Sequence, residues 1–543
     1  MNMRRLGLGA ALTLAATMVA GTAEAQLKDV TQIGPTVAGG AINKSLVQEI
    51  GAGRGSIFIP DSSRFIINRD PFRAIRRGRQ IFQRKFQVGQ GQGPLSNDGV
   101  GNPAFIGGDP SVAAGLADSC AACHGRPRGS AGHGGDVVTR PDSRDAPHLF
   151  GLGLQEQLAD EMTTSLRAIR AEALNQAAAN EMAATLPLVA KGVNFGSITA
   201  NADGTLNTSA VVGVDPDLRV RPFFAQGLTI SIREFLVGAF NAEMGLESFD
   251  NDLVLAAGGA DVVTPSGMLL SGSIDKIEIA PVGSVTTDGD ADGITDEIPE
   301  SIVDFEEFYL LHYFKAGTQV TPTNSSAVTM GRATFTAIGC VTCHRPTFTI
   351  ASDRRVADLE TNFSDFNPMM PLTSGNPFNR MFAVATAFVL ETDDGDLPTL
   401  KRHTNHSFVV RNIFTDFKRH DLGPNFHERN YEGTFSTLFI TEPLWGVGTT
   451  APYGHDGRSA TLEDVILRHG GEAATSATAF AALSPTAKSF VIDFLQSLIL
   501  FPPDDTPSSL PNGQINPAAA NFPQNGHGAI ALTGLFNNPA DLE

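Results

Sequence analysis

Two short motifs of the same type carry the clearest chemistry in the sequence. They are Cys120-Ala-Ala-Cys123-His124 and Cys340-Val-Thr-Cys343-His344. Two cysteines three positions apart can form thioether bonds to the two vinyl groups of one haem, and the histidine that follows can bind its iron. All four cysteines of the chain belong to these motifs, so no further cysteine can complete a tetrahedral zinc site or form a disulfide. We therefore expect two covalently attached c-type haems.

The acidic segment Asp288-Gly-Asp290-Ala-Asp292-Gly293-Ile-Thr-Asp296 is a second candidate for ion binding. Carboxylates at alternate positions, with a glycine that permits a sharp turn, are typical of calcium loops. Pro299 occupies the position at which an EF-hand carries its bidentate glutamate, so this is not a true EF-hand loop. We expect Asp288, Asp290, Asp292 and Asp296 to bind calcium, and an acidic surface turn is the alternative.

Composition limits the class of protein and its partners. The chain has 543 residues and a formal net charge of -19, which is enough length for two or three domains. Such an acidic surface argues against nucleic acid as a partner and suits a basic redox protein, although a merely solvated surface has the same charge. The chain contains 35 Phe but only 4 Tyr and 1 Trp. Phenylalanine suits the apolar lining of two macrocycles. Because tryptophan is oxidised far more easily, Trp445 is a candidate electron station between the haems, with a packed core residue as the alternative.

The first 25 residues predict export. Residues 1–25 begin with a short basic stretch, continue with an apolar segment and end with the small residues Ala23-Glu24-Ala25. This order is that of a secretory signal peptide. No later segment is apolar for the length that a membrane span needs. Because c-type haem is attached outside the bacterial cytoplasm, we expect a periplasmic protein without a membrane span.

Periodicity predicts a mainly α-helical fold. Helical patterns cover residues 71–86, 154–187, 302–314, 462–469 and 487–500. Each haem motif follows a predicted helix and precedes an Arg-Pro pair, which indicates an internal duplication. We expect an N-terminal haem domain over residues 26–189, a C-terminal haem domain over 301–501, and a tail rich in Pro, Asn and Gly over 502–543. Between the domains, residues 190–300 read as an inserted segment rich in strands and loops that contains the acidic loop.

Several further segments resemble the bacterial di-haem oxidoreductases, which are relatives of the di-haem cytochrome c peroxidases and of rubber oxygenases. The resemblance spans residues 75–500 apart from the insertion. It rests on Gly151-Leu-Gly-Leu-Gln-Glu156, the acidic loop before a helix, Arg419-His-Asp-Leu-Gly-Pro424, Glu442-Pro-Leu-Trp-Gly446, Ala451-Pro-Tyr-Gly-His-Asp-Gly-Arg458 and Thr461-Leu-Glu-Asp-Val-Ile-Leu-Arg-His-Gly-Gly-Glu472. It implies two cytochrome-c-like domains with one haem each and the active site at the N-terminal haem.

The resemblance also implies roles for individual residues. In the family a methionine often binds the second haem fourteen residues after the histidine that His455 matches, and here that position is His469. We therefore expect His344 and His469 to bind one iron, with Met369, Met370, Met381 and His420 as replacements for His469. His133 matches a removable ligand or pocket acid/base of the first haem, and a loop histidine is the alternative. Glu156 and then Glu181 are the candidates for proton transfer during peroxide cleavage, although glutamates on such a helix more often face water.

These features together predict a di-haem oxidoreductase. The expected reaction is the reduction of hydrogen peroxide at the first haem (Cys120, Cys123, His124), with electrons relayed from a small periplasmic donor through the second (Cys340, Cys343, His344, His469). The alternatives are an oxygenase of the rubber-oxygenase type, which would use dioxygen, and a di-haem electron carrier with both irons closed.

Overall fold

The computed structural model describes ten ranges of the chain: residues 45–69, 71–93, 119–124, 145–313, 316–318, 323–355, 389–393, 397–401, 407–430 and 433–500. The predicted signal peptide and the C-terminal tail lie outside these ranges. So do His133, Met369, Met370 and Met381. In the described part of the chain, no helix combines the length and the apolarity that a membrane span requires.

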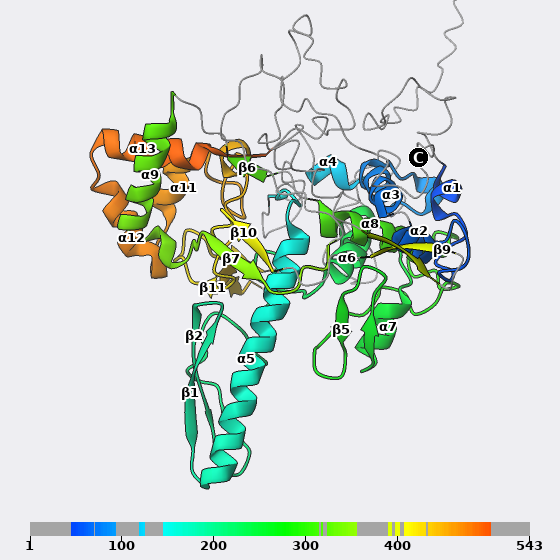
Figure 1. Cartoon of the computed structure of the whole chain (residues 1–543). Coiled ribbons are helices and arrows are strands. Elements are labelled where there is room, and N and C mark those ends of the chain that lie inside the picture. Colours follow the sequence, from blue (N-terminus) through cyan, green and yellow to red (C-terminus); the bar gives the residue numbers. More distant parts are fainter. Residues whose placement is uncertain are drawn as a thin grey trace, which may run out of the picture.

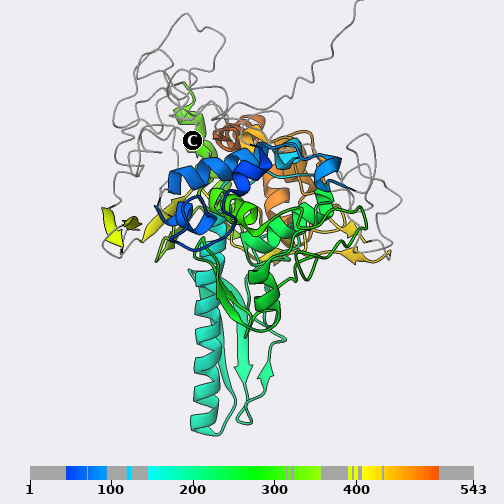
Figure 2. The same cartoon turned by 90° about the vertical axis from the view of Figure 1, so that its right-hand side faces the viewer.

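The described chain is mainly helical, with several small sheets of two or three strands (Figure 1). One group of helices contains α2 (Ser63–Arg69), α3 (Pro71–Gln83), α6 (Ile232–Met244) and α8 (Glu300–His312). A second group contains α9 (Ser325–Ala337), α11 (Leu462–Arg468), α12 (Ala474–Ala481) and α13 (Pro485–Gln496). The long helix α5 (Leu152–Asn180) runs from between them, and its far end projects from the body together with β1 (Ala184–Ala190) and β2 (Val193–Ala200), as Figures 1 and 2 show.

A close crossing of α3 and α8 forms the centre of the first group. Gly78 of α3 lies so near α8 that a Cβ atom in its place would clash with the backbone carbonyl of Phe305. Ile81 of α3 and Phe308 of α8 are fully buried in the same core. The first haem motif forms the short helix α4 (Cys120–His124), and Cys120 packs against this core.

The second group repeats this arrangement. Helix α9 precedes the second haem motif and crosses α13, and Gly331 of α9 is the contact point because a Cβ atom there would clash with the carbonyl of Phe490. Phe335 and Phe494 pack edge to face with ring centroids 5.4 Å apart. The two glycines stand in equivalent sequences, Gly78-Arg-Gln-Ile-Phe82 and Gly331-Arg-Ala-Thr-Phe335. The predicted duplication is thus visible as two glycine-centred helix crossings, one beside each motif.

This repeat corrects the predicted domain boundary at residues 300/301. In each unit a helix precedes the haem motif and a later helix closes over it, and α8 is the closing helix of the first unit. Residues of α8 such as Ile302 and Phe305 share a core with Ile66 and Ile81 near the N-terminus. The N-terminal unit therefore extends to His312, because burial of the apolar faces of α3 requires α8. That the units are cytochrome-c-like stays a prediction.

The segment 190–300 is less rich in strands than its composition predicts. The predicted helix over 154–187 ends at Asn180, and β1 already begins at Ala184, so the β-hairpin starts before the predicted insertion. Strands β1, β2 and β3 (Leu206–Asn207) form one antiparallel sheet, and its apolar side chains pack on α5. The remainder contains α6 and α7 (Asn251–Ala257), besides the hairpin of β4 (Asp261–Val263) and β5 (Leu269–Ser271). A capping box of Ser231 and Glu234 begins α6, a local signal that the composition hides.

The other strands are short and occur in antiparallel pairs. They are β6 (Ala316–Thr318) with β15 (Leu498–Leu500), β7 (Thr347–Ile350) with β10 (Phe408–Arg411), β8 (Val389–Asp393) with β9 (Leu397–Lys401), β11 (Arg419–His420) with β14 (Phe439–Ile440), and β12 (Glu428–Arg429) with β13 (Phe435–Ser436). The pairing of β7 with β10 places the chain that follows the second motif beside the segment that leads to Phe414, whose carbonyl oxygen accepts a hydrogen bond from His344.

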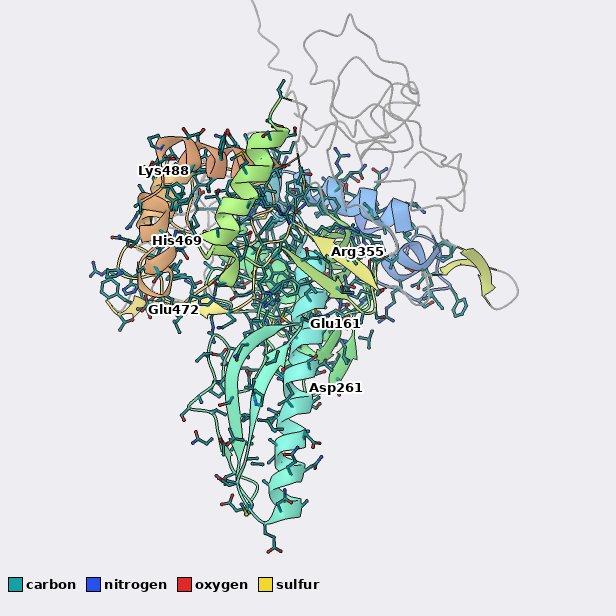
Figure 3. All side chains as sticks on the ribbon, turned by 60° about the vertical axis from the view of Figure 1, so that its left-hand side comes forward. Glu161, Asp261, Arg355, His469, Glu472 and Lys488 are labelled. Carbon is teal, nitrogen blue, oxygen red and sulfur yellow. The ribbon has the colours of Figure 1, made fainter. Side chains whose placement is uncertain are left out.

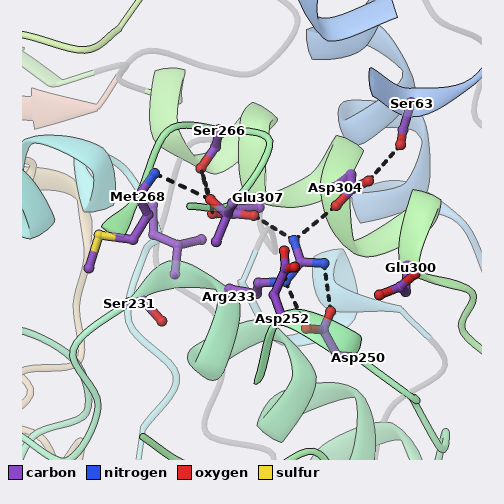
Figure 4. Close-up of polar contacts among 12 residues, drawn as sticks. Ser63, Ser231, Arg233, Asp250, Asp252, Ser266, Met268, Glu300, Asp304 and Glu307 are labelled. Atoms are coloured by element: carbon purple, nitrogen blue, oxygen red, sulfur yellow. Dashed lines mark hydrogen bonds and ion pairs between the residues drawn. The ribbon is translucent and has the colours of Figure 1, made fainter. Parts of the chain in front are cut away.

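A buried ion-pair network joins α6, α7 and α8 (Figure 4). The Arg233 guanidinium donates to Asp250 at 2.9 Å, to Asp304 at 2.9 Å and to Glu307 at 2.8 Å, and its side chain is fully buried. Thr264 and Ser266 donate hydroxyl hydrogen bonds to the other oxygen of Glu307. The network fixes the rotation of α8, which decides which α8 side chains face the first haem motif.

Candidate haem sites

The first haem motif lies on one turn of helix, which places Cys120 and Cys123 on the same side. Cys120 Sγ donates to Glu306 Oε1 at 3.1 Å. His124 Nδ1 donates to the carbonyl oxygen of Pro147 at 2.6 Å. Iron-binding histidines commonly donate one ring nitrogen to a carbonyl, which fixes the ring and leaves the other nitrogen to bind the metal. The geometry of His124 therefore fits a proximal ligand that binds through Nε2.

Glu306 is a buried carboxyl beside this motif that the sequence did not identify. It is fully buried on α8. Burial raises its pKa to about 8, with the nearby Glu49 adding to the effect and the hydrogen bond from Cys120 opposing it. Its Oε2 has no hydrogen-bond partner in the described part of the chain. A protonated glutamic acid next to the first haem site can hold and release a proton near neutral pH.

His148 connects the first motif to the second unit. It follows Pro147, and its Nε2 donates to the carbonyl oxygen of Trp445 at 2.7 Å, while its Nδ1 accepts from the amide of Phe150 at 3.2 Å. Burial lowers the pKa of His148 to about 4, with a further contribution from the neighbouring His124, against the opposing effect of the Trp445 carbonyl. Both ring nitrogens are thus engaged, so His148 is not placed to bind iron.

Trp445 lies in the core that α5 shares with both units. It is 3% exposed, and its indole Nε1 donates to the carbonyl oxygen of Arg411 at 3.2 Å. The amide of the preceding Leu444 donates to Ile413 at 2.9 Å, and the next carbonyl, that of Phe414, holds His344. Trp445 is therefore joined by hydrogen bonds to the segments next to both residues that orient the two histidines, and its role as an electron station stays a prediction.

The second motif presents His344 in the same way as the first presents His124. Cys340–Thr342 form a 3-10 turn, and His344 Nδ1 donates to the carbonyl oxygen of Phe414 at 2.9 Å. Burial lowers the pKa of His344 to about 4; the charges of the neighbouring His469 and His420 act in the same direction, and the Phe414 carbonyl and Asp416 oppose them. The ring is thus neutral and oriented, as an iron ligand must be.

His469 has the matching geometry at the end of α11 (Figure 3). Its Nδ1 donates to the carbonyl oxygen of Val465 at 2.6 Å, and its ring packs edge to face against Phe426 at 5.1 Å. Burial lowers its pKa. His344 and His469 thus each hold a ring by Nδ1, and the charge of His469 contributes to the lowered pKa of His344. That their Nε2 atoms bind one iron stays a prediction.

His420, a predicted replacement for His469, has a different role. Its Nδ1 contacts Glu472 at 2.7 Å and its Nε2 contacts Asp416 at 3.0 Å. Burial alone would lower the pKa of His420, but hydrogen bonds to Asp416, Cys343 and Glu472 raise it to about 11. Cys343, Asp416 and His420 have metal-like spacing, yet a protonated imidazole bound on both sides cannot bind iron. In this structure His420 is therefore not placed as an iron ligand.

The two glutamates predicted to carry protons are not placed for that role. Glu156 is 1% exposed, accepts from the amide of Ile232 at 2.6 Å, and forms an ion pair with Arg354 through its other oxygen. It ties α5 to the start of α6. Glu181 is exposed and is the C-cap residue of α5. This end of α5 projects away from the body that contains both haem motifs (Figure 1). The family resemblance singled out Glu156 but could not predict that Ile232 and Arg354 are its partners.

The acidic loop holds three of its four predicted residues together. Oxygens of Asp288, Asp290 and Asp292 lie within 4.8 Å of one another, and Asp296 is not part of this group. A second group joins Asp290 to Glu247 and Glu297. The sequence did not identify these two as ligands, because Glu247 lies 41 positions before Asp288 and Glu297, at the end of the acidic segment, falls outside the alternating spacing of the aspartates.

The donor sets fit two c-type haems. Each site combines two cysteines three positions apart with a histidine whose Nδ1 is held by a backbone carbonyl, and the second adds His469. His148, which follows the residue that orients His124, is engaged at both nitrogens and is not placed as a second ligand of the first iron. With His469 at the second site alone, the two irons would be inequivalent.

Comparison with known proteins supports the resemblance over part of the chain. Residues 386–498 match the model of the family described as "Di-haem oxidoreductase, putative peroxidase", which is the family that the motifs resemble. The matched region contains His420, Trp445 and His469, and it lies after both Cys-x-x-Cys-His motifs. The predicted family is thus confirmed for the C-terminal part of the chain.

The other comparisons add little. No curated protein matches the chain. Among solved structures, a chain of hydrazine synthase from Kuenenia stuttgartiensis matches with 14% identity and a TM-score of 0.20, covering 36% of this chain and 55% of that one. The match thus spans about half of that neighbour's length, and at this TM-score it carries no argument about the fold.

Proposed function

We propose that this protein is a periplasmic di-haem c-type oxidoreductase that reduces hydrogen peroxide at the N-terminal haem and relays electrons to it through the C-terminal haem. The family match over residues 386–498 supports the class of enzyme. The observation that carries the division of roles is the pair His344 and His469, whose Nδ1 atoms both donate to backbone carbonyls. A second site closed by two imidazoles suits electron transfer and leaves peroxide to the first.

At the first site, the bound haem would supply an iron that accepts peroxide and the electrons that its reduction requires. Reduction of peroxide to two water molecules consumes two protons and two electrons. His124 would hold the iron from one side, oriented by Pro147. Glu306, whose pKa burial raises to about 8, would hold a proton close to this site and replaces Glu156 as our candidate for proton transfer.

Between the sites, Trp445 would shorten the path for electrons. Its carbonyl holds His148, next to the residue that orients His124, and its neighbour Leu444 is bonded to Ile413, next to the residue that orients His344. The small electron donor would reduce the second haem. The acidic net charge of -19 suits a basic donor.

The test is a comparison of ligand binding and turnover in the purified holoprotein. Visible and EPR spectra should contain one low-spin bis-histidine signal and one signal that changes on addition of cyanide. Hydrogen peroxide should be consumed in the presence of a reduced small cytochrome. Two low-spin haems that bind neither cyanide nor carbon monoxide would instead identify an electron carrier. Oxidative cleavage of a polyene with dioxygen, without peroxide turnover, would identify an oxygenase.

A further inference from the structure

The segment Asp288–Asp292 folds into a tight loop that presents carboxylates inward. Asp288 accepts from the amide of Gly293 at 3.0 Å, Asp290 from that of Asp292 at 3.1 Å, and Asp292 from that of Ile294 at 2.7 Å. Each bond uses one oxygen of the carboxylate and leaves the second oxygen for another partner. The second oxygen of Asp288 is buried and has no hydrogen-bond partner in the described part of the chain.

Two glutamates from outside the loop complete the cluster. Glu247, which follows α6, accepts from the amide of Gly289 at 2.7 Å, and its own amide donates to Glu297 at 2.6 Å. Both side chains are 3% exposed. Glu297 Oε1 is buried and lacks a hydrogen-bond partner among the described residues. A buried carboxylate oxygen in that state is unfavourable unless a proton or a cation binds it.

The oxygens of the cluster lie close enough together to share one cation. Each of the groups Asp288, Asp290, Asp292 and Glu247, Asp290, Glu297 has oxygens within 4.8 Å of one another. Calcium binds six to eight oxygens at about 2.3–2.6 Å, many of them from carboxylates, so either group can supply three of its ligands. Magnesium binds at about 2.1 Å and retains its water molecules, so it suits such an all-carboxylate group less well.

The electrostatics of the cluster point the same way. Burial raises the pKa of Asp290 to about 6 and that of Glu297 to about 9, and the neighbouring carboxylates add to both shifts. Burial and the charges of Asp288 and Asp292 also raise the pKa of Glu247. These shifts reflect the same crowding of carboxylates that the two groups of oxygens show in their geometry.

We propose that Asp288, Asp290, Asp292, Glu247 and Glu297 form a calcium site that is separate from the haem chemistry. The ion would join the loop to the end of α6 and to the start of α8, because Glu247 lies three residues after Met244 and Glu297 lies three residues before Glu300. Gly91 also lies against the side chain of Glu297, because a Cβ atom at Gly91 would clash with the Glu297 carboxylate. Calcium would thus fasten three segments of the N-terminal unit at one point.

The experiment uses the full holoprotein, stripped with a chelator and then dialysed. Calorimetric titration with calcium chloride should show saturable binding, and calcium should raise the melting temperature, while magnesium at the same concentration should do neither to a comparable extent. Asp290→Ala with Asp292→Ala should abolish binding. Glu297→Gln should weaken binding at least tenfold, because it removes the charge that lies outside the loop motif.

Asp203→Asn is the matched control, since it removes one acidic charge from an exposed turn of the projection. It should leave calcium affinity unchanged. Haem content and circular dichroism identify any variant that fails to fold, and Glu247→Gln then replaces it with the same expected tenfold loss. Absence of heat and of stabilisation in the native protein would overturn the site. Unchanged affinity in folded Glu297→Gln and Glu247→Gln would overturn the part of the proposal that extends beyond the loop.

Discussion

His148 donates its Nε2 hydrogen to the carbonyl oxygen of Trp445 at 2.7 Å, although the two residues are 297 positions apart. This bond joins the segment around Pro147, which orients His124, to the segment around Trp445, which is hydrogen-bonded next to the residue that orients His344. It gives the single tryptophan of the chain a place between the two candidate haems, and it makes the relay between them open to a direct test.

Trp445→Phe is expected to slow electron transfer between the haems without opening either site. Phenylalanine preserves an aromatic ring in the core but removes the indole and its hydrogen bond to Arg411. Stopped-flow spectroscopy should record slower transfer from the second haem to the first and an equal fall in kcat, with unchanged spectra of the resting haems. Phe417→Leu, in the same core, is the control for a packing defect. An unchanged transfer rate in Trp445→Phe would exclude Trp445 from the relay.

Replacement of His469 should change the second haem alone. His469→Gly should open that iron and produce a high-spin signal, and His469→Met should keep it low-spin while raising its reduction potential, because a thioether ligand raises the potential. EPR spectroscopy and redox titration measure both. His427→Gly is the control, because His427 contacts Asp421 at 2.9 Å and is half-buried on the surface loop. A low-spin second haem in His469→Gly would show that another residue binds the iron.

Arg233→Met should be strongly destabilising. It removes the cation that Asp250, Asp304 and Glu307 share in a buried network, and breaking such a network from one side costs about 3–5 kcal/mol. Chemical denaturation should record this loss. Arg64→Met, at an exposed position of α2, should change the free energy of unfolding by less than about 0.5 kcal/mol. Equal stability of the two variants would mean that the network does not hold α8 in place.

The chelated protein should lose stability as pH rises. The folded-state pKa values of Glu297 and Glu306 are raised to about 9 and about 8, so the folded protein binds protons that the unfolded chain releases above pH 4.5 or so. The contribution of these groups is fully present below about pH 4.5 and is lost as pH rises through 8 to 9. Melting temperatures in a chelator between pH 5 and pH 9 should therefore decline.

The double variant Glu297→Gln with Glu306→Gln should flatten that decline, since amides do not titrate. Asp203→Asn is again the control. Hydrogen bonds from Thr205 lower the pKa of Asp203, so its contribution is lost as pH falls through its folded pKa and is constant between pH 6 and pH 9. This control should leave the slope above pH 6 unchanged. An equally steep decline in the double variant would mean that other groups cause it.

The sequence by itself determined the features that depend on neighbours along the chain. The spacing of Cys120, Cys123 and His124 and its copy predict haem attachment because the atoms involved lie within one helical turn. Periodicity located α3, α8, α11 and α13 to within a few residues, since side chains three and four positions apart share a helix face. His469 was placed by counting along one such helix, and its geometry fits the role.

Only the tertiary structure decided which distant segments meet. Helix α3 pairs with α8 and not with a helix of its own predicted domain. Glu306 contacts Cys120, and Glu247 and Glu297 approach the acidic loop. All of these contacts depend on the path of the chain between the residues involved. Glu156 is the clearest case, because the same buried carboxylate could hold a proton or pair with an arginine. Arg354 lies 198 positions later in the chain, and only folding brings it there. Burial and charge pairing are properties of that assembled surrounding, and no local pattern encodes them.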